Sequence, residues 1–163
     1  MAYDFFGIPV SELNVWLIWI LPFAAAMIIP AVGKFSKLTT GRVAVAFAAM
    51  SAISAATLFP MALGAHEIHH QIMWIDAIGL KAGVLADPLS VIMSNVVGWI
   101  SFLIMCYSTG YMKGDKDITR FWFWMMFFIG SMQLIVLSDN LLQVFFGWEG
   151  VGLASYALIS FWY

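Results

Sequence analysis

Residues 121–163 read FWFWMMFFIGSMQLIVLSDNLLQVFFGWEGVGLASYALISFWY. Two apolar runs in this stretch are separated only by the polar residues Ser138, Asp139 and Asn140. An α-helix needs about 20 mostly apolar residues to cross a hydrocarbon core about 30 Å thick, and each run approaches or exceeds that length. The stretch therefore predicts two consecutive transmembrane helices.

The composition of the whole chain agrees with a bilayer as the solvent. Charged residues make up 10% of the 163 residues, against roughly 25% in soluble domains, and hydrophobic residues make up 63%. A water-facing surface cannot be assembled from so few polar side chains. The formal net charge of -2 and the seven scattered Lys and Arg residues also exclude the basic surface of a nucleic-acid-binding protein.

Five stretches in all are long and apolar enough to cross a membrane, or nearly so. Pro22 and Pro30 lie inside the first of them and predict a kink there. The second is rich in Ala and Ser, which favours close contact with neighbouring helices over exposure to lipid. We therefore predict an all-α, polytopic transmembrane bundle that forms one membrane region over residues 1–163. The predicted helices cover residues 15–32, 43–63, 89–111, 121–137 and 141–163.

The cations are distributed unevenly between the two ends of these helices. Six of the seven follow the first or the third helix, and Lys81 alone lies in the other set of connections. Lys and Arg in short loops stay on the cytoplasmic side of a membrane. We therefore expect a multi-pass protein of a prokaryotic cytoplasmic membrane, with its N-terminus outside and the C-terminus of this chain cytoplasmic. The six cations expected on the cytoplasmic side are Lys34, Lys37, Arg42, Lys113, Lys116 and Arg120.

One connection, from about Gly64 to Pro88, is long enough to hold structure of its own. Residues 71–75 and 80–85 have the pattern of two short strands joined by a turn at residues 76–79, which predicts a short extracytoplasmic hairpin. An isolated two-stranded hairpin is marginally stable in water. We therefore expect the hairpin to lie on the helix ends or on a partner subunit.

Glu149 is the only charged side chain predicted deep within a helix, eight residues after Leu141 and so about 12 Å from the outer end. An ion in that position costs several kcal/mol, and intramembrane carboxylates generally face a bundle interior and mark ion or proton paths. We interpret Glu149 as a proton-relay residue; the alternative is a protonated side chain that hydrogen-bonds a neighbouring helix. All five lysines lie in predicted loops, so a cationic partner would come from outside this chain.

Small residues surround Glu149 in the sequence. Gly147, Gly150 and Gly152 remove bulk from the predicted helix, so that neighbouring backbones or ordered waters can approach closely. Tight helix packing explains these glycines at least as well as a hydrated path does.

Two further carboxylates, Asp87 and Asp139, lie just before predicted helices. Asp87 precedes Pro88, where an acid complements the dipole of a helix N-terminus, and Asn140 has capping-box spacing to Gln143. Helix capping is the favoured role for these positions, and a place on a proton path is the alternative.

Residues 66–70, HEIHH, formally match the H-E-x-x-H zinc pattern, in which two histidines one helical turn apart bind the metal and the Glu activates water. A zinc hydrolase also needs a stable helix and a third ligand, whereas His66, Glu67 and His70 follow Gly64 at the exit of the second predicted helix. We assign no metal site here, and surface histidines are the favoured interpretation.

The run from Leu137 to Ile159 closely resembles subunit L of the respiratory complex I family, the large antiporter-like membrane subunit. ADPLS at residues 86–90 resembles the acid-led start of the family's third helix, although Gly is commoner there than Pro88, and YSTGYM at residues 107–112 supports the same alignment. The family includes the corresponding subunit of the methanogen deazaflavin-coenzyme dehydrogenase and is related to the large subunit of multisubunit sodium/proton antiporters. GWEGVG at residues 147–152 is closer to the complex I type. The resemblance, strong from about Gln71 onward, implies the N-terminal part of such a subunit.

This resemblance implies a proton-translocating membrane subunit that works beside other membrane subunits of a complex I-like oxidoreductase, with electron transfer to a quinone-like acceptor coupled to proton pumping. In the family, the Glu that matches Glu149 modulates a membrane lysine two helices further along, outside this chain. No cofactor is expected in this chain, whereas flavin, iron–sulfur clusters and the quinone-like acceptor are expected in other subunits. The alternatives are a structural or assembly segment without its own transport role, and the large subunit of a multisubunit sodium/proton antiporter.

Overall fold

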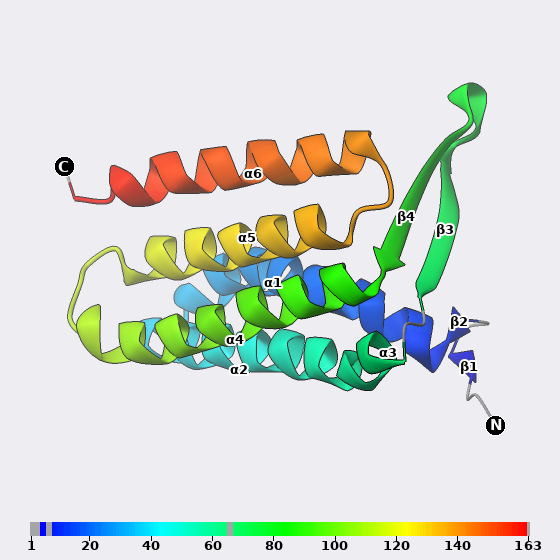
Figure 1. The fold of residues 1–163 in the computed structure, drawn as a ribbon. Helices are drawn as coiled ribbons and strands as arrows, with labels where there is room; N and C mark the ends of the chain where they lie inside the picture. The colour runs from blue at the N-terminus through cyan, green and yellow to red at the C-terminus, as the bar shows by residue number, and fades with distance from the viewer. Residues whose placement is uncertain (1–3, 6–7, 65–66, 163) are drawn as a thin grey trace.

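The computed structural model describes residues 4–5, 8–64 and 67–162 of the chain. Five of its described helices or helix pairs are long and apolar enough to cross a membrane, which confirms the prediction of an all-α, polytopic membrane protein. Figure 1 shows these spans running side by side, with the N-terminus and a projecting hairpin at one end and the C-terminus at the other.

The helices follow one another with short connections except before α4. Their bounds are α1 Val10–Gly33, α2 Lys37–Thr57, the short α3 Phe59–Leu63, α4 Pro88–Tyr111, α5 Ile118–Leu137 and α6 Leu141–Ile159. Two antiparallel pairs of strands accompany them: β1 Asp4–Phe5 with β2 Ile8–Pro9, and β3 Ile68–Ile75 with β4 Leu80–Ala86, the second pair joined through the 3-10 turn η1 Asp76–Ile78.

The second helix differs from the continuous element that we predicted over residues 43–63. It begins earlier, at Lys37, because the Ser36 hydroxyl accepts a hydrogen bond of 3.4 Å from the Thr39 N–H and caps the first turn. It then breaks at Leu58, between α2 and α3, just before Pro60. Proline has no N–H to donate and is best accommodated in the first turn of a helix, so α3 starts around Pro60, whereas α1 continues through Pro22 and Pro30.

The last helix ends at Ile159, four residues before the end that we predicted. The chain then turns, and Phe161 folds back so that only 7% of its surface is exposed. The ring lies 5.8 Å from the Phe121 ring, and the Arg120 guanidinium lies 5.0 Å above it while donating a 2.8 Å hydrogen bond to the Phe161 carbonyl. These contacts hold the chain against the start of α5 and stop α6 from continuing.

The small residues of α2 allow the close helix contact that the composition predicted. Ala44, Ala48, Ala52 and Ala55 are all buried in one stripe along the helix. A Cβ placed on Gly98 of α4 would lie only 3.2 Å from the Ala52 Cα, so the two backbones approach as closely as small side chains permit.

Buried polar side chains cross-link the helices inside the bundle. The Ser94 hydroxyl of α4 donates to Gln133 Oε1 of α5 at 2.8 Å, and Gln133 Nε2 donates back to the Ser94 carbonyl at 3.0 Å. The Ser51 hydroxyl of α2 donates to the Ile18 carbonyl of α1 at 2.6 Å. All three side chains are fully buried or nearly so, and each finds a partner within the protein where lipid would supply none.

The predicted hairpin is confirmed, and its base rests on the helix ends. Val84 of β4 forms an isolated bridge with Ser138, between α5 and α6, and Trp16 Nε1 of α1 donates a 3.1 Å hydrogen bond to His70 Nδ1 of β3. The Trp74 ring lies 5.9 Å from the Phe146 ring of α6. The turn at the tip projects beyond the bundle (Figure 1), whereas the contacts of His70, Val84 and Trp74 hold the strands against the helices of this chain.

The contact between α5 and α6 depends on two glycines of α6. A Cβ on Gly147 would lie 2.7 Å from Ile135 Cγ1 and 3.0 Å from the Ser131 carbonyl oxygen, and one on Gly150 would collide with the Ser131 hydroxyl. Both glycines therefore serve close packing. A Cβ on Gly152 would meet nothing within 4 Å, so packing inside this chain does not explain that glycine.

Gly147→Ala should loosen the α5–α6 contact, because Ile135 and the α5 backbone leave no room for the added methyl group. Overpacking of this kind costs about 1–3 kcal/mol. We expect a lower thermal unfolding midpoint for the purified complex that contains the subunit. Gly110→Ala, in the last turn of α4 where an added Cβ meets nothing within 4 Å, is the matched control and should not lower the midpoint. Equal midpoints for the two variants would contradict the packing role.

Candidate functional site

Glu149 lies near the middle of the 19-residue helix α6. Its side chain is exposed on the surface of the described chain, so the helices of this chain do not enclose the carboxyl as we expected for a relay residue. The neighbours of α6 account for this, since α6 packs chiefly against α5 alone. The opposite side of α6 has no cover from the rest of the bundle.

The open side of α6 is a continuous stripe of large side chains that includes the carboxylate. Phe145, Trp148, Leu153 and Tyr156 are all more than half exposed. Phe145 and Leu153 lie four residues before and after Glu149, and therefore on the same side of the helix. A charged group within such an apolar stripe is unfavourable in contact with lipid tails. The stripe has the character of a helix face that is completed by further protein.

The other charged side chains of the described spans lie near helix ends. Glu12 lies in the first turn of α1, Lys37 and Arg42 in the first two turns of α2, and Arg120 in the first turn of α5. Glu149 is thus the one charged residue in a central turn among the spans that the structure describes. No cation from those spans lies in the same central turns of the membrane, as the sequence predicted.

Asp87 is the N-cap of α4. Its Oδ1 accepts the Ser90 N–H at 2.7 Å, and the Ser90 hydroxyl accepts the Asp87 N–H at 2.8 Å, so the two residues form a reciprocal capping box. The hydrogen bonds from the Ser90 backbone and side chain lower the pKa of the Asp87 carboxyl below its usual value. The contacts of Asp87 are therefore those of a helix cap, the role that the sequence favoured.

Asn140 is the N-cap of α6, and its Oδ1 accepts the Gln143 N–H at 3.0 Å. Gln143 does not return the bond to the Asn140 backbone as a capping box would. Its Oε1 instead accepts the Gly83 N–H of β4 at 2.8 Å and the Asn140 amide at 2.6 Å. The Gln143 side chain, which was expected to complete the capping box, therefore links the hairpin to the start of α6 by hydrogen bonds.

Asp139 joins the same connection to the other strand of the hairpin. Its side chain is 2% exposed, and its Oδ2 accepts a 2.6 Å hydrogen bond from Gln71 and lies 3.2 Å from His69 Nε2. Asn140 Nδ2 donates to the second oxygen at 2.7 Å. Burial raises the pKa of the Asp139 carboxyl, but the hydrogen bonds from Gln71, His69 and Asn140 outweigh that effect and leave the pKa lowered. Asp139 is therefore held as a carboxylate.

The histidine cluster does not have the arrangement of a zinc hydrolase. Ile68–Ile75 is a strand, so His69 and His70 point to opposite sides, the first toward Asp139 and the second toward Trp16 and Glu12. His66 lies outside the described residues. Within the described part of the chain, no three His, Cys, Asp or Glu side chains are grouped closely enough to hold a metal ion.

Sequence reasoning missed two of these clusters. The Gln133–Ser94 pair had a signal, since each residue is polar in the middle of an apolar segment, but pairing across helices cannot be read from spacing within one helix. His69 and Asp139 are separated by 70 positions in the chain. Only the folding of the hairpin onto the α5–α6 connection brings them together.

Comparison with known proteins supports the resemblance stated from the sequence. Residues 73–122 match the family described as NADH-Ubiquinone oxidoreductase (complex I), chain 5 N-terminus. The matched region contains most of the hairpin, all of α4 and the first turns of α5.

Curated relatives extend the match over nearly the whole chain. The chain is 40% identical over 152 residues to the NADH-quinone oxidoreductase subunit L of Rickettsia bellii, with 90% of this chain and 24% of that protein aligned. It is 39% identical over 156 residues to the protein of the same name from Mycobacterium tuberculosis, covering 91% of this chain and 24% of that protein. The NAD(P)H-quinone oxidoreductase subunit 5 of Spinacia oleracea chloroplasts is 36% identical over 158 residues, or 91% of this chain and 21% of that protein.

A solved structure agrees with the fold. A chain of the Mrp complex from Dietzia sp. DQ12-45-1b superposes with a TM-score of 0.74 over 90% of this chain and 16% of that chain, at 23% sequence identity. This similarity concerns the arrangement of the helices.

Five membrane-length spans in the described part of the chain define a multi-pass, all-α membrane protein. The chain belongs to the complex I subunit L, or chain 5, family and matches its N-terminal part. It spans about a quarter of the length of the curated relatives. The relatives from Rickettsia bellii and Mycobacterium tuberculosis are named as subunits of an NADH-quinone oxidoreductase.

Asp139→Asn should loosen the base of the hairpin, because it removes the charge that Gln71 and His69 contact. A hydrogen bond to a charged group contributes roughly 1.5–3 kcal/mol, so we expect at least about tenfold faster amide exchange in β3 and β4 by mass spectrometry. Asp76→Asn, at the exposed tip, is the matched control. Unchanged exchange in Asp139→Asn would contradict the anchoring role.

The lowered pKa of Asp139 also sets the direction of a pH effect on this anchor. A carboxyl whose folded-state pKa is depressed stabilises the structure above its unfolded-state pKa, and that stabilisation is lost as the pH falls through the folded-state value. Protection factors of the hairpin amides in the wild type should therefore fall in acid below the usual range of an aspartate, and Asp139→Asn should lack that step.

Proposed function

We propose that this chain is the N-terminal part of a proton-translocating membrane subunit of a complex I-like respiratory oxidoreductase, in which Glu149 is a proton-relay residue. Electron transfer to a quinone-like acceptor in other subunits would drive the translocation. The single observation that carries the proposal is the place of Glu149, in a central turn of a membrane-length helix and on the side of α6 that this chain leaves uncovered.

The energetic argument for a relay starts from the surroundings of this carboxyl. A charged side chain at the bilayer centre costs roughly 2.5–3.5 kcal/mol or more, so Glu149 requires polar or charged partners from protein or ordered water. The described lysines lie at or beyond the helix ends and do not reach the middle of α6. The partner therefore comes from polypeptide beyond these helices, in agreement with the membrane lysine that the family resemblance implies.

A carboxyl between desolvation and a nearby cation is suited to proton transfer. Desolvation favours the neutral acid, whereas an approaching cation favours the carboxylate. A partner cation that moves or changes its protonation would therefore make Glu149 take up or release a proton. The exposed stripe around Glu149 provides the surface on which such a partner would pack.

No redox group is placed in this chain. An iron–sulfur cluster is usually held by four cysteine thiolates, and the sequence has only Cys106. We assign the flavin, the iron–sulfur clusters and the quinone-like acceptor to other subunits. The proposed role of this chain is proton translocation that is driven by electron transfer in other subunits.

The orientation proposed for the chain follows from the separation of charges at the two bundle ends. The α1–α2 turn and the α4–α5 loop lie at the end opposite the hairpin (Figure 1) and carry the cations of residues 34–42 and 113–120. We infer that this end faces the cytoplasm of a prokaryotic cell, with the hairpin and the N-terminus outside.

A structural role in assembly is the second candidate, and the hairpin favours it. Ile72, Met73, Trp74 and Ile75 are 40–54% exposed on a strand that projects past the bundle. Apolar side chains in that position are suited to contact with a neighbouring subunit. The antiporter alternative has only the similarity of helix arrangement in its favour.

Glu149→Gln in the intact complex tests the relay. Gln keeps the size of the side chain and one acceptor oxygen but cannot exchange a proton, so we expect pumping in proteoliposomes to lose the larger part of its rate while the complex stays assembled. Tyr156→Phe, on the same exposed stripe, is the control and should pump normally. Full pumping by Glu149→Gln, with assembly lost only when the hairpin tip is deleted, would instead favour the structural role.

Single-cysteine labelling tests the orientation. In a Cys106→Ser background, Asp76→Cys in the hairpin should react with a membrane-impermeant maleimide added outside intact cells, and Lys116→Cys should react only after the membrane is opened. The reverse pattern of labelling would overturn the proposed topology.

A further inference from the structure

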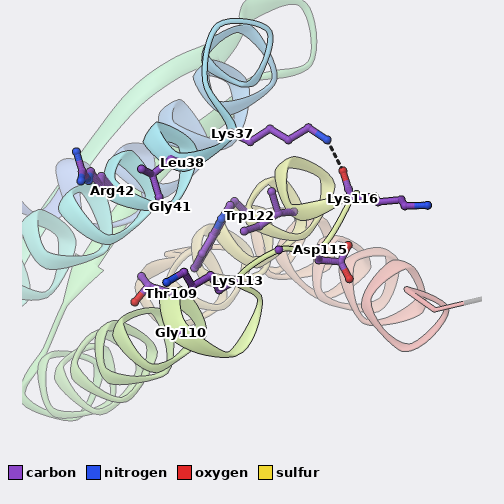
Figure 2. A pocket seen from close by; sticks show the side chains of 12 residues that line it. Lys37, Leu38, Gly41, Arg42, Thr109, Gly110, Lys113, Asp115, Lys116 and Trp122 are labelled. Atoms are coloured by element: carbon purple, nitrogen blue, oxygen red, sulfur yellow. Dashed lines mark hydrogen bonds between the residues drawn. The ribbon is translucent and has the colours of Figure 1, made fainter.

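A large cavity lies at the end of the bundle opposite the hairpin. It has a volume of about 810 Å³ and is enclosed by the first turns of α2, the last turn of α4 and the α4–α5 loop. Figure 2 shows Lys37 and Arg42 on its α2 side and Lys113 and Lys116 on its loop side. No residue that we assign to the relay or to the hairpin anchor lines it.

The rim of this cavity is strongly cationic. Lys37, Arg42, Lys113 and Lys116 line the cavity together with one carboxylate, Asp115. Asp115 already accepts hydrogen bonds from the Asp117 N–H at 2.8 Å and from Trp162 Nε1 at 3.2 Å, and it forms no ion pair with the four cations in the described part of the chain. The Lys37 ammonium donates to the Lys116 carbonyl at 2.6 Å, as Figure 2 shows, which places it at the cavity mouth. The four cations outnumber the two carboxylates of this loop, Asp115 and Asp117, so the rim keeps a net positive charge.

The inner wall is apolar and contains a buried donor without an acceptor. Trp122 is 1% exposed, and its indole Nε1 has no hydrogen-bond partner among the described residues. The indole lies against Gly41, where an added Cβ would be 3.0–3.2 Å from the ring. The nitrogen itself is buried, so Trp122 contributes only the apolar surface of its ring to the wall and its N–H is not accessible to a guest. Leu38, 69% exposed beside it, continues the apolar surface outward.

We propose that this cavity binds an anionic phospholipid, with the phosphate of the headgroup at the cationic rim and the apolar part of the lipid along the apolar wall. The cavity lies at the ends of membrane-spanning helices, which is the depth of lipid headgroups. The N-termini of α2 and α5 both begin at its wall, and their dipoles add to the attraction for an anion. A free phosphate would use the cations but not the apolar wall, whereas a lipid uses both.

Photocrosslinking in the intact complex tests this site. The complex is reconstituted in phosphatidylcholine bilayers, photoactivatable phosphatidylglycerol is added in increasing amounts, and crosslinks to residues 37–42 and 109–122 are mapped by mass spectrometry. Each Lys or Arg near an anionic headgroup contributes roughly a fivefold factor in affinity. Arg42→Gln with Lys113→Gln should therefore raise the half-saturating fraction of phosphatidylglycerol about 25-fold.

Two further variants test whether the crosslinking depends on the charges at the cavity, on the shape of the cavity, or only on a general attraction of the lipid to a cationic protein surface. Lys34→Gln with Lys81→Gln removes two cations that do not line the cavity and should leave the crosslinking unchanged. Gly110→Leu keeps the charge but adds bulk to the cavity wall, where a Cβ meets nothing within 4 Å, and should weaken the crosslinking.

Several results would overturn the proposal. Equal crosslinking by a photoactivatable phosphatidylcholine would show that the cavity does not select an anion. Competition by millimolar inorganic phosphate with no retained lipid would identify a free anion as the occupant. A carbodiimide crosslink between Lys113 and an acidic side chain of a neighbouring polypeptide would show that protein, rather than lipid, covers the cationic rim.

Discussion

The hydrocarbon core of a bilayer supplies no hydrogen-bond partner, and this constraint organises the whole chain. The five spans satisfy their backbones as helices, and the deeply buried Gln133 and Ser51 find partners on neighbouring helices. Glu149 does not follow this pattern, because it lies in a central turn of α6 with an uncovered surface around it. The structure thus combines a bundle that is internally complete with one helix whose functional face needs further protein.

The two ends of the bundle have different chemistry. At one end the hairpin is anchored through Asp139 and Gln143, which use charged and amide oxygens to bind both strands to the α5–α6 connection. At the other end, cations gather around an apolar cavity with the buried Trp122 ring in its wall. The first end is built to hold protein elements together, and the second has the polarity of a lipid–water interface.

Several local features were predictable because they depend on residues close in sequence. The apolar runs, the cap residues Asp87 and Asn140, and the turn of the hairpin follow from side-chain chemistry within a few positions. The break before Pro60 was also encoded locally but was missed, because hydropathy alone does not register a missing N–H. The Asp139–His69 contact and the destination of Gln143 could not be predicted, since they join segments about 60–70 positions apart.

Three properties could be predicted from the sequence by itself: that this protein crosses a membrane, how many spans it has, and that a single carboxylate lies in the middle of the fifth span. They could be predicted because hydrophobicity and helix length are local properties of the chain. Only the tertiary structure decided which way that carboxylate faces and which residues surround the cationic cavity. Those properties depend on how each helix is rotated against its neighbours, and that rotation is set by close contacts such as Gly147 against Ile135, which no single segment encodes.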